Sequence, residues 1–415
     1  MIRSCISWCR HLLYALAMLA LLGCLTEIGL RVYDSATGQV TRPDLYDKGL
    51  VCKSWSVHHH LKPSHNFAVR HPDRDERIRV ELNSLGLRGK EVAIPRPQGT
   101  YRIICLGDET TLASQTPEEE TYCARLRQSF HPRDARQVEV LNAGVPEYCP
   151  LLSYLQFKQQ LLGLQPDLVI IHVAMDDISD DYRYRRLAVM QGGGLPVSCA
   201  HPGLEMPAAG RKSKGNRADD LFLLPVWCRQ KLTRFWANQS LGDSARSIDS
   251  PQGKYLWLED HPPDWSTHIE HALAPLVHLR DLVESLPAEL VVVVSPAPWQ
   301  VSSKASSGEG VREQLGLSRD EHFRSTRPFE IVAEFCRVQG LACCDLAPAF
   351  RRAAQPERLY LEHAAALSPE GHALFAQELG HFLENSLGQP SPAGQPTGSR
   401  REELIDLPQA RLPRR

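Results

Sequence analysis

Acidic residues stand where apolar segments of this sequence end. Asp108 and Glu109 follow one apolar run after a single glycine, Gly107, and Asp176 and Asp177 follow another. Carboxylates that are brought together raise one another's proton affinity or recruit a cation. We therefore hypothesise a pocket for a cation or a cationic ligand; the alternative is a pocket whose acids are solvated or protonated. The groups that could meet there are five acids and two histidines: Asp108, Glu109, Glu147, Asp176, Asp177, His172 and His363.

The segments that must position these residues read as alternating strands and helices. Short apolar runs separated by helical patterns predict a parallel sheet covered on both faces, hence a three-layer α/β/α domain. Sites in such sheets form at the carboxyl ends of the strands. The predicted strands are 103–106, 138–141, 168–173, 290–294 and 341–346, and the predicted helices are 119–130, 151–164, 265–285, 328–339 and one that begins after Ser368.

The chain divides into four parts by composition. Residues 1–34 form an N-terminal anchor and residues 35–97 an irregular lead-in. Residues 98–387 form the α/β/α domain, with an insertion at about 189–256 that contains an amphipathic helix near 221–236. Residues 388–415 are rich in Pro, Gly, Ser, Gln and Arg, a composition typical of disorder.

The N-terminus has the order of a signal anchor. Arg3 and Arg10 precede an apolar run from Leu12 to Leu25, so we expect a transmembrane helix with the bulk of the chain outside the cytoplasm, in the periplasm or at the cell surface. The stretch before Cys24 also resembles a lipoprotein box, and lipidation of that residue stays an alternative.

The overall charge argues against one class of partner. Lys and Arg number 47 and Asp and Glu 49, which leaves a net charge of −2 and no basic excess to bind nucleic acid. We expect no cofactor, and we expect the membrane to be a partner through the N-terminal helix.

Six stretches, in order, resemble the membrane-anchored SGNH (GDSL) hydrolase-like proteins of bacteria, which have a flavodoxin-like three-layer fold. Each stretch alone is a weak signal, and the six together cover about residues 80 to 385. They are Asn83-Ser-Leu-Gly-Leu-Arg-Gly, Arg102-Ile-Ile-Cys-Leu-Gly-Asp, Val140-Leu-Asn-Ala-Gly-Val-Pro, Pro166-Asp-Leu-Val-Ile-Ile, Asp177-Ile-Ser-Asp-Asp and Leu367-Ser-Pro-Glu-Gly-His.

The resemblance implies a serine nucleophile, a glycine amide and an asparagine that bind the oxyanion, and a DxxH pair that supplies the base and its orienting acid. All five positions are changed here. Glu109 stands at the serine, Glu147 at the glycine and Asp176 at the asparagine, while His363 replaces the acid and Ala366 the base. A carboxylate cannot act as the hydroxyl nucleophile, and a methyl group cannot accept its proton.

Residues of the family's scaffold remain. Those expected around the pocket are Gly107, Asp108, Asn142, Gly144 and Asp177.

The resemblance therefore implies a pseudoenzyme that acts as a binding or scaffolding module in the cell envelope, for a glycan or an acylated ligand, or as an assembly partner. The alternative is a divergent esterase that acts on acyl esters or acylated carbohydrates. It would need another nucleophile such as Cys149, or a base such as His363 beside Glu362. We expect no imidazole across the pocket that could assist a nucleophile.

Overall fold

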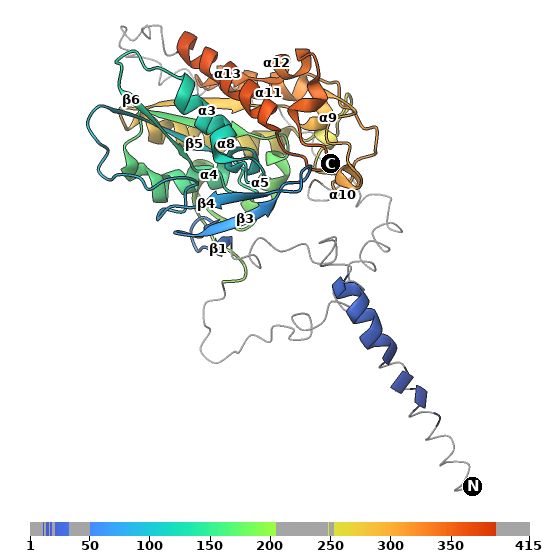
Figure 1. Ribbon diagram of the computed structural model, residues 1–415. Coiled ribbons are helices and arrows are strands. Elements are labelled where there is room, and N and C mark those ends of the chain that lie inside the picture. The colour runs from blue at the N-terminus through green and yellow to red at the C-terminus, as the bar shows by residue number, and fades with distance from the viewer. Residues whose placement is uncertain are drawn as a thin grey trace, which may run out of the picture.

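A five-stranded parallel sheet forms the centre of the protein (Figure 1). This computed structural model describes residues 11, 14–15, 17–18, 21–32, 50–204, 248 and 253–386. The spatial order of the strands is β11-β10-β7-β5-β6, so the strand of this sheet that comes first in the chain, β5, lies between the second, β6, and the third, β7. The strands are β5 (Thr100–Leu106), β6 (Gln137–Asn142), β7 (Leu168–Val173), β10 (Glu289–Val294) and β11 (Ala342–Asp345).

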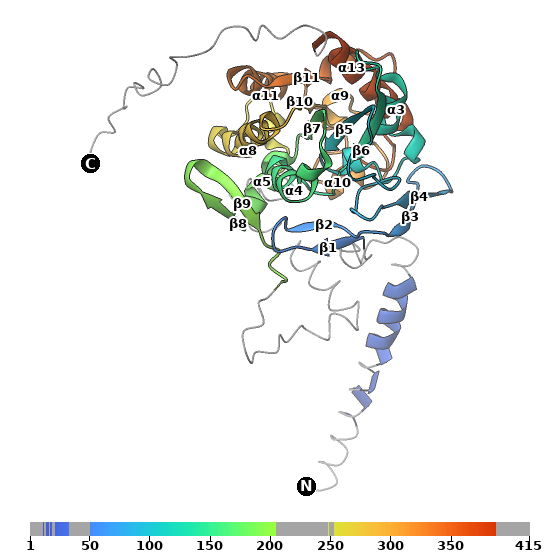
Figure 2. The same cartoon turned by 90° about the vertical axis from the view of Figure 1, so that its left-hand side faces the viewer.

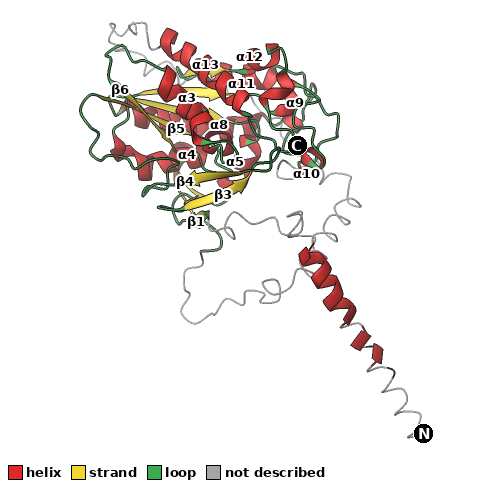
Figure 3. Cartoon of the chain, in the orientation of Figure 1, coloured by secondary structure: helices red, strands yellow, loops and turns green. Residues whose placement is uncertain are grey.

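Helices cover both faces of this sheet, which confirms the predicted three layers (Figures 2 and 3). Side chains of α3, α12 and α13 pack on one face, and those of α4, α5, α8 and α11 pack on the other. The helices are α2 (Glu109–Leu112), α3 (Tyr122–Ser129), α4 (Pro150–Gln156), α5 (Asp177–Arg185), α8 (Ser266–Glu284), α9 (Pro298–Val301), α10 (Val311–Gln314), α11 (Arg327–Val338), α12 (Ala347–Arg352) and α13 (Pro369–Ser386).

The central strands are apolar on both faces because both faces are covered. Every residue of β7 is buried, and so are the last four of β10, which are valines. This continuous burial explains why the strands read as unbroken apolar runs rather than as alternating ones. The five predicted strands are all present, and β7 has the predicted bounds.

The lead-in is more regular than expected. It contains two antiparallel pairs, β1 (Val51–Lys53) with β2 (His59–Leu61) and β3 (Asn66–Arg70) with β4 (Arg77–Glu81). In β4 only the second and fourth residues are buried, a pattern that marks one covered face. A third hairpin, β8 (Ala188–Gln191) with β9 (Leu195–Cys199), begins the predicted insertion.

The expected helix near 221–236 and the tail 388–415 lie outside the described residues. Residues 21–32 are helical, and their apolar side chains, among them Leu21, Leu25 and Ile28, are exposed. In the described part of the chain, no helix has the length and apolar character that a membrane crossing requires.

Candidate functional site

The strand order creates a crevice between β5 and β7. The chain leaves β5 for β6 on one side and later adds β7 on the other, and ligands of open α/β sheets bind at such a switch point, outside the carboxyl ends of the strands. A cavity of about 310 Å³ lies there. Its walls include the residues that follow three strands, among them Asp108 after β5, Asp176 after β7 and Ser295 after β10.

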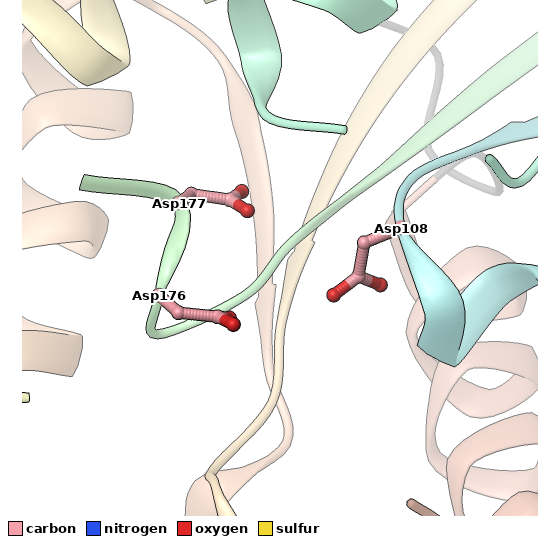
Figure 4. Close-up of side chains that lie close together, drawn as sticks. All are labelled: Asp108, Asp176 and Asp177. Carbon is pink, nitrogen blue, oxygen red and sulfur yellow. The ribbon is translucent and has the colours of Figure 1, made fainter. Parts of the chain in front are cut away.

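Three aspartates meet at this edge of the sheet, as Figure 4 shows. Oxygen atoms of Asp108, Asp176 and Asp177 all lie within 4.8 Å of one another. The Asp177 carboxylate also accepts a hydrogen bond from the Ala174 amide at 3.1 Å. Burial, followed by the charges of Asp108 and Asp176, raises the pKa of Asp177 well above its usual range, so this side chain favours its protonated form.

A lysine that the sequence analysis missed neutralises part of this cluster. Nζ of Lys254 lies 2.6 Å from Oδ2 of Asp176 and 3.9 Å from Oδ2 of Asp180. Burial acts against the charge on Lys254, but Asp176 and Asp180 outweigh it and raise the pKa of the amine. Burial likewise acts against the charge on Asp176, but Lys254 lowers the pKa of that carboxyl below its ordinary value. The pair is therefore an ion pair at neutral pH.

Glu109 occupies the cavity wall at the start of α2. Its side chain is exposed. Partial desolvation of its carboxylate by the cavity wall, followed by the neighbouring charges of Asp108 and Asp176, raises the pKa of Glu109 above its usual range.

Three of the retained scaffold residues, Gly107, Asn142 and Gly144, lie against α2 rather than line the cavity. Nδ2 of Asn142 donates a 2.6 Å hydrogen bond to the Thr111 carbonyl, and its Oδ1 accepts one from the Gly144 amide. A Cβ atom on Gly144 would lie 2.2 Å from the Leu112 amide nitrogen, so no larger residue fits. Gly107 meets a similar limit, because a Cβ atom there would lie 2.3 Å from Oγ1 of Thr111.

A hydroxyl, an imidazole and a carboxylate lie next to one another at the cavity wall; the imidazole is hydrogen-bonded to the hydroxyl but not to the carboxylate. Nε2 of His172 is 2.8 Å from Oγ of Ser295, and Nδ1 of His172 is 3.4 Å from Oδ1 of Asp108. All three residues line the cavity and are more than nine-tenths buried. This contact corrects the expectation that no imidazole assists a nucleophile here. The histidine lies on β7, not in the last motif, where the family carries its base.

Two of the five changed family positions lie away from the cavity. Glu147 turns outward and accepts hydrogen bonds from Arg183 at 2.9 Å and from the Tyr184 hydroxyl at 3.0 Å. The imidazole of His363 contacts the carboxylate of Asp73, and this carboxylate also accepts a hydrogen bond from the backbone amide of His363. The expected convergence thus holds for Asp108, Glu109, Asp176, Asp177 and His172, and not for these two.

The thiol proposed as an alternative nucleophile is also misplaced. Cys149 precedes α4, is 1 % exposed and does not line the cavity. Burial raises the pKa of its thiol well above the usual range, so little thiolate forms at neutral pH. His372 does line the cavity, but burial lowers its pKa to about 3, and its Nδ1 accepts a hydrogen bond from the Tyr122 amide.

Sequence reasoning missed Lys254, Tyr255, Ser295 and Trp299, which all line the cavity. Ser295 carried a usable signal, since it directly follows four valines at the end of a predicted strand. Lys254 carried none, because it lies in a segment that reads as an insertion.

No protein-family model and no curated protein matches the chain. Solved structures with some likeness are an acetylxylan esterase, Axe2, from Geobacillus stearothermophilus and a lipolytic protein of the G-D-S-L family from Desulfitobacterium hafniense. The first is 12 % identical with a TM-score of 0.35, over 68 % of this chain and 94 % of that one. The second is 15 % identical with a TM-score of 0.33, over 68 % and 99 %. Likeness at this level carries no conclusion about activity.

Proposed function

We propose that this protein binds a small ligand in the cavity between β5 and β7, and that it has lost the catalytic set of the SGNH hydrolases that its motifs resemble. The observation that carries this is the cavity wall itself. Glu109 and Ala366 line it, at the positions where the resemblance puts the nucleophile and its base. Neither side chain can take the corresponding part in ester hydrolysis.

The cavity has the character of a small-molecule site. About 310 Å³ is at the lower end of the usual range, and it suits an acyl group or one sugar ring. Aromatic side chains Tyr255, Trp299 and Tyr360 form part of the wall, with the small residues 364–366 beside them. Flat apolar surfaces with a few polar groups favour an acylated carbohydrate or another acyl ester of the cell envelope.

The proposed location is the outer side of a membrane. Its support is the basic-then-apolar order of the N-terminus and the exposed apolar side chains of helix 21–32. Such side chains favour a lipid or protein environment over water. Lipidation at Cys24 is the alternative form of anchoring, and the mass of the mature N-terminal peptide distinguishes the two.

Binding is tested with a variant that fills the cavity. We expect acetylated oligosaccharides and short acyl esters to raise the melting temperature of the detergent-purified chain. Ala366→Phe should abolish that shift, because its ring would occupy the cavity. Ala354→Phe is the matched control, since Ala354 is exposed and lies outside the cavity wall. An equal shift in all three proteins would place binding elsewhere and end the proposal.

Ester cleavage is the second candidate function. The contact between Ser295 and His172 favours it, because it supplies within the same cavity the hydroxyl and the base that the family's positions lack.

A further inference from the structure

We infer that Ser295, His172 and Asp108 form a replacement nucleophile–base–acid chain that cleaves an ester bound in the cavity. This inference rests on the proposed ligand binding and adds a reaction to it. Glu109, His363 and Ala366, at the family's own catalytic positions, take no part in it.

The sheet register explains how Ser295 reaches His172. In the pairing of β10 with β7, Val293 lies opposite His172. Side chains alternate along a strand, so Ser295, two residues after Val293, points to the same face as both. One step beyond the end of β10, its hydroxyl lies beside the imidazole at the cavity wall.

The carboxylate of Asp108 lies on the other side of the imidazole, next to Nδ1. Asp108 also accepts a 2.9 Å hydrogen bond from the Thr110 amide, which holds its carboxylate at the start of α2. Nδ1 of His172 makes no hydrogen bond among the described residues, and Oδ1 of Asp108 lies 3.4 Å from it. In the inferred chain Nδ1 carries the proton that faces this carboxylate, and Nε2 accepts the Ser295 hydrogen. The 3.4 Å distance from Nδ1 to Oδ1 is long, and such contacts commonly tighten when substrate binds.

The reaction balances with water as the only co-reactant. Oγ of Ser295 bonds to the ester carbonyl carbon while its proton passes to Nε2 of His172. The carbon–oxygen bond to the alcohol then breaks, and the leaving alcohol takes that proton. Water next attacks the acyl group on Ser295 and gives a proton to Nε2. The carboxylic acid leaves, and Ser295 recovers its hydrogen.

The oxyanion that develops during ester cleavage needs a hydrogen-bond donor, and negative charge from nearby carboxylates would destabilise it. The indole N–H of Trp299 is buried, belongs to a cavity-lining residue and has no hydrogen-bond partner among the described residues. It is therefore available to an oxygen of the bound ester. Because Lys254 pairs with Asp176, the cavity carries less negative charge than its acids suggest.

The test combines covalent labelling with turnover. The detergent-purified full chain is treated with a fluorophosphonate probe, and the labelled peptide is identified by mass spectrometry. The same protein is assayed with p-nitrophenyl acetate. We expect the adduct on Ser295, and we expect Ser295→Ala and His172→Gln to lower turnover at least about 100-fold. Ser285→Ala is the control, because Ser285 is an exposed serine at the end of α8.

A second variant keeps the inference testable if turnover is slow. In Ser295→Cys the thiol at this position should react with iodoacetamide faster than in the double variant Ser295→Cys, His172→Gln, because the imidazole takes its proton. Equal alkylation rates, or wild-type turnover that survives Ser295→Ala, would overturn the inference. Ligand-induced stabilisation without any Ser295 adduct would overturn it too, but would leave the binding proposal standing. If neither ligand-induced stabilisation nor a Ser295 adduct is observed, the binding proposal and the ester-cleavage inference are both wrong.

Discussion

The ammonium group of Lys254 lies 2.6 Å from the Asp176 carboxylate, at the mouth of a cluster of buried acids. Lys254 comes from a distant part of the chain, between the described hairpin β8–β9 and helix α8. Its ammonium group provides the positive charge that the clustered aspartates would otherwise obtain by binding a cation from solution. This ion pair therefore governs how the acids behave.

Removing this lysine should destabilise the fold. Lys254→Met leaves Asp176 without its partner, and breaking a largely buried pair costs about 3 kcal/mol. Urea unfolding at pH 7 measures the loss. Lys304→Met, at an exposed lysine, should change the free energy of unfolding little. Adding Asp176→Asn to Lys254→Met should recover part of the stability, and failure of both effects would show that the pair contributes little.

The same lysine sets the response to metal ions. We expect Mg²⁺, Ca²⁺ and Mn²⁺ to leave the melting temperature of the wild-type protein unchanged, because Lys254 already occupies the charge position beside Asp176. In Lys254→Met the three aspartates are free to bind a cation, and a divalent ion should raise the melting temperature. Adding Asp108→Asn to that variant should remove the effect. A metal-dependent shift in the wild type would instead support the cation site that the sequence suggested.

Asp180 should make stability depend on pH. Burial is the main cause that raises its pKa to about 7, so the folded protein holds a proton that the unfolded chain releases near pH 4. A carboxyl whose pKa is raised by folding stabilises the folded protein fully when the pH is below the pKa of that carboxyl in the unfolded chain. This contribution to the free energy of unfolding is lost as the pH rises toward 7. Asp180→Asn should therefore gain stability over the wild type at pH 8 and gain little at pH 4. Parallel stability curves for the two proteins would contradict the raised pKa.

Restoring the family's nucleophile alone should not restore its reaction. In a Ser295→Ala background, we expect Glu109→Ser to show no ester turnover, because Ala366 supplies no base. Adding Ala366→His places an imidazole on the cavity wall and should give measurable turnover of p-nitrophenyl acetate. Activity from Glu109→Ser alone would mean that His172 can serve a second hydroxyl.

Gly144 should tolerate no side chain. A Cβ atom 2.2 Å from the Leu112 amide nitrogen would push against backbone, which cannot swing aside as a side chain can. Gly144→Ala should lower the free energy of unfolding by about 2 kcal/mol, a typical cost of overpacking. Gly163→Ala is the matched control, because nothing lies within 4 Å of its added atom. Similar unfolding curves for the two variants would contradict the tight approach.

Local patterns in the sequence were enough to predict the five strands of the central sheet and the edge of that sheet at which chemistry could occur. Unbroken apolar runs such as 168–173 report burial on both faces, and acids directly after them mark the carboxyl ends of the strands. The positions of Glu109 and Ala366 on the cavity wall followed from motifs of a few residues. These features are local, so neighbouring residues suffice to predict them.

Which of these residues come into contact depends on the three-dimensional arrangement of the strands and loops. Ser295 reaches His172 because β10 pairs with β7 in one register, and no local pattern encodes a register between strands more than 100 residues apart. Glu147 accepts a hydrogen bond from Arg183 and therefore lies away from the cavity. Lys254, from a segment without a regular sequence pattern, pairs with Asp176. Such contacts depend on how loops close and charges pair in space, which the order of residues along the chain does not reveal.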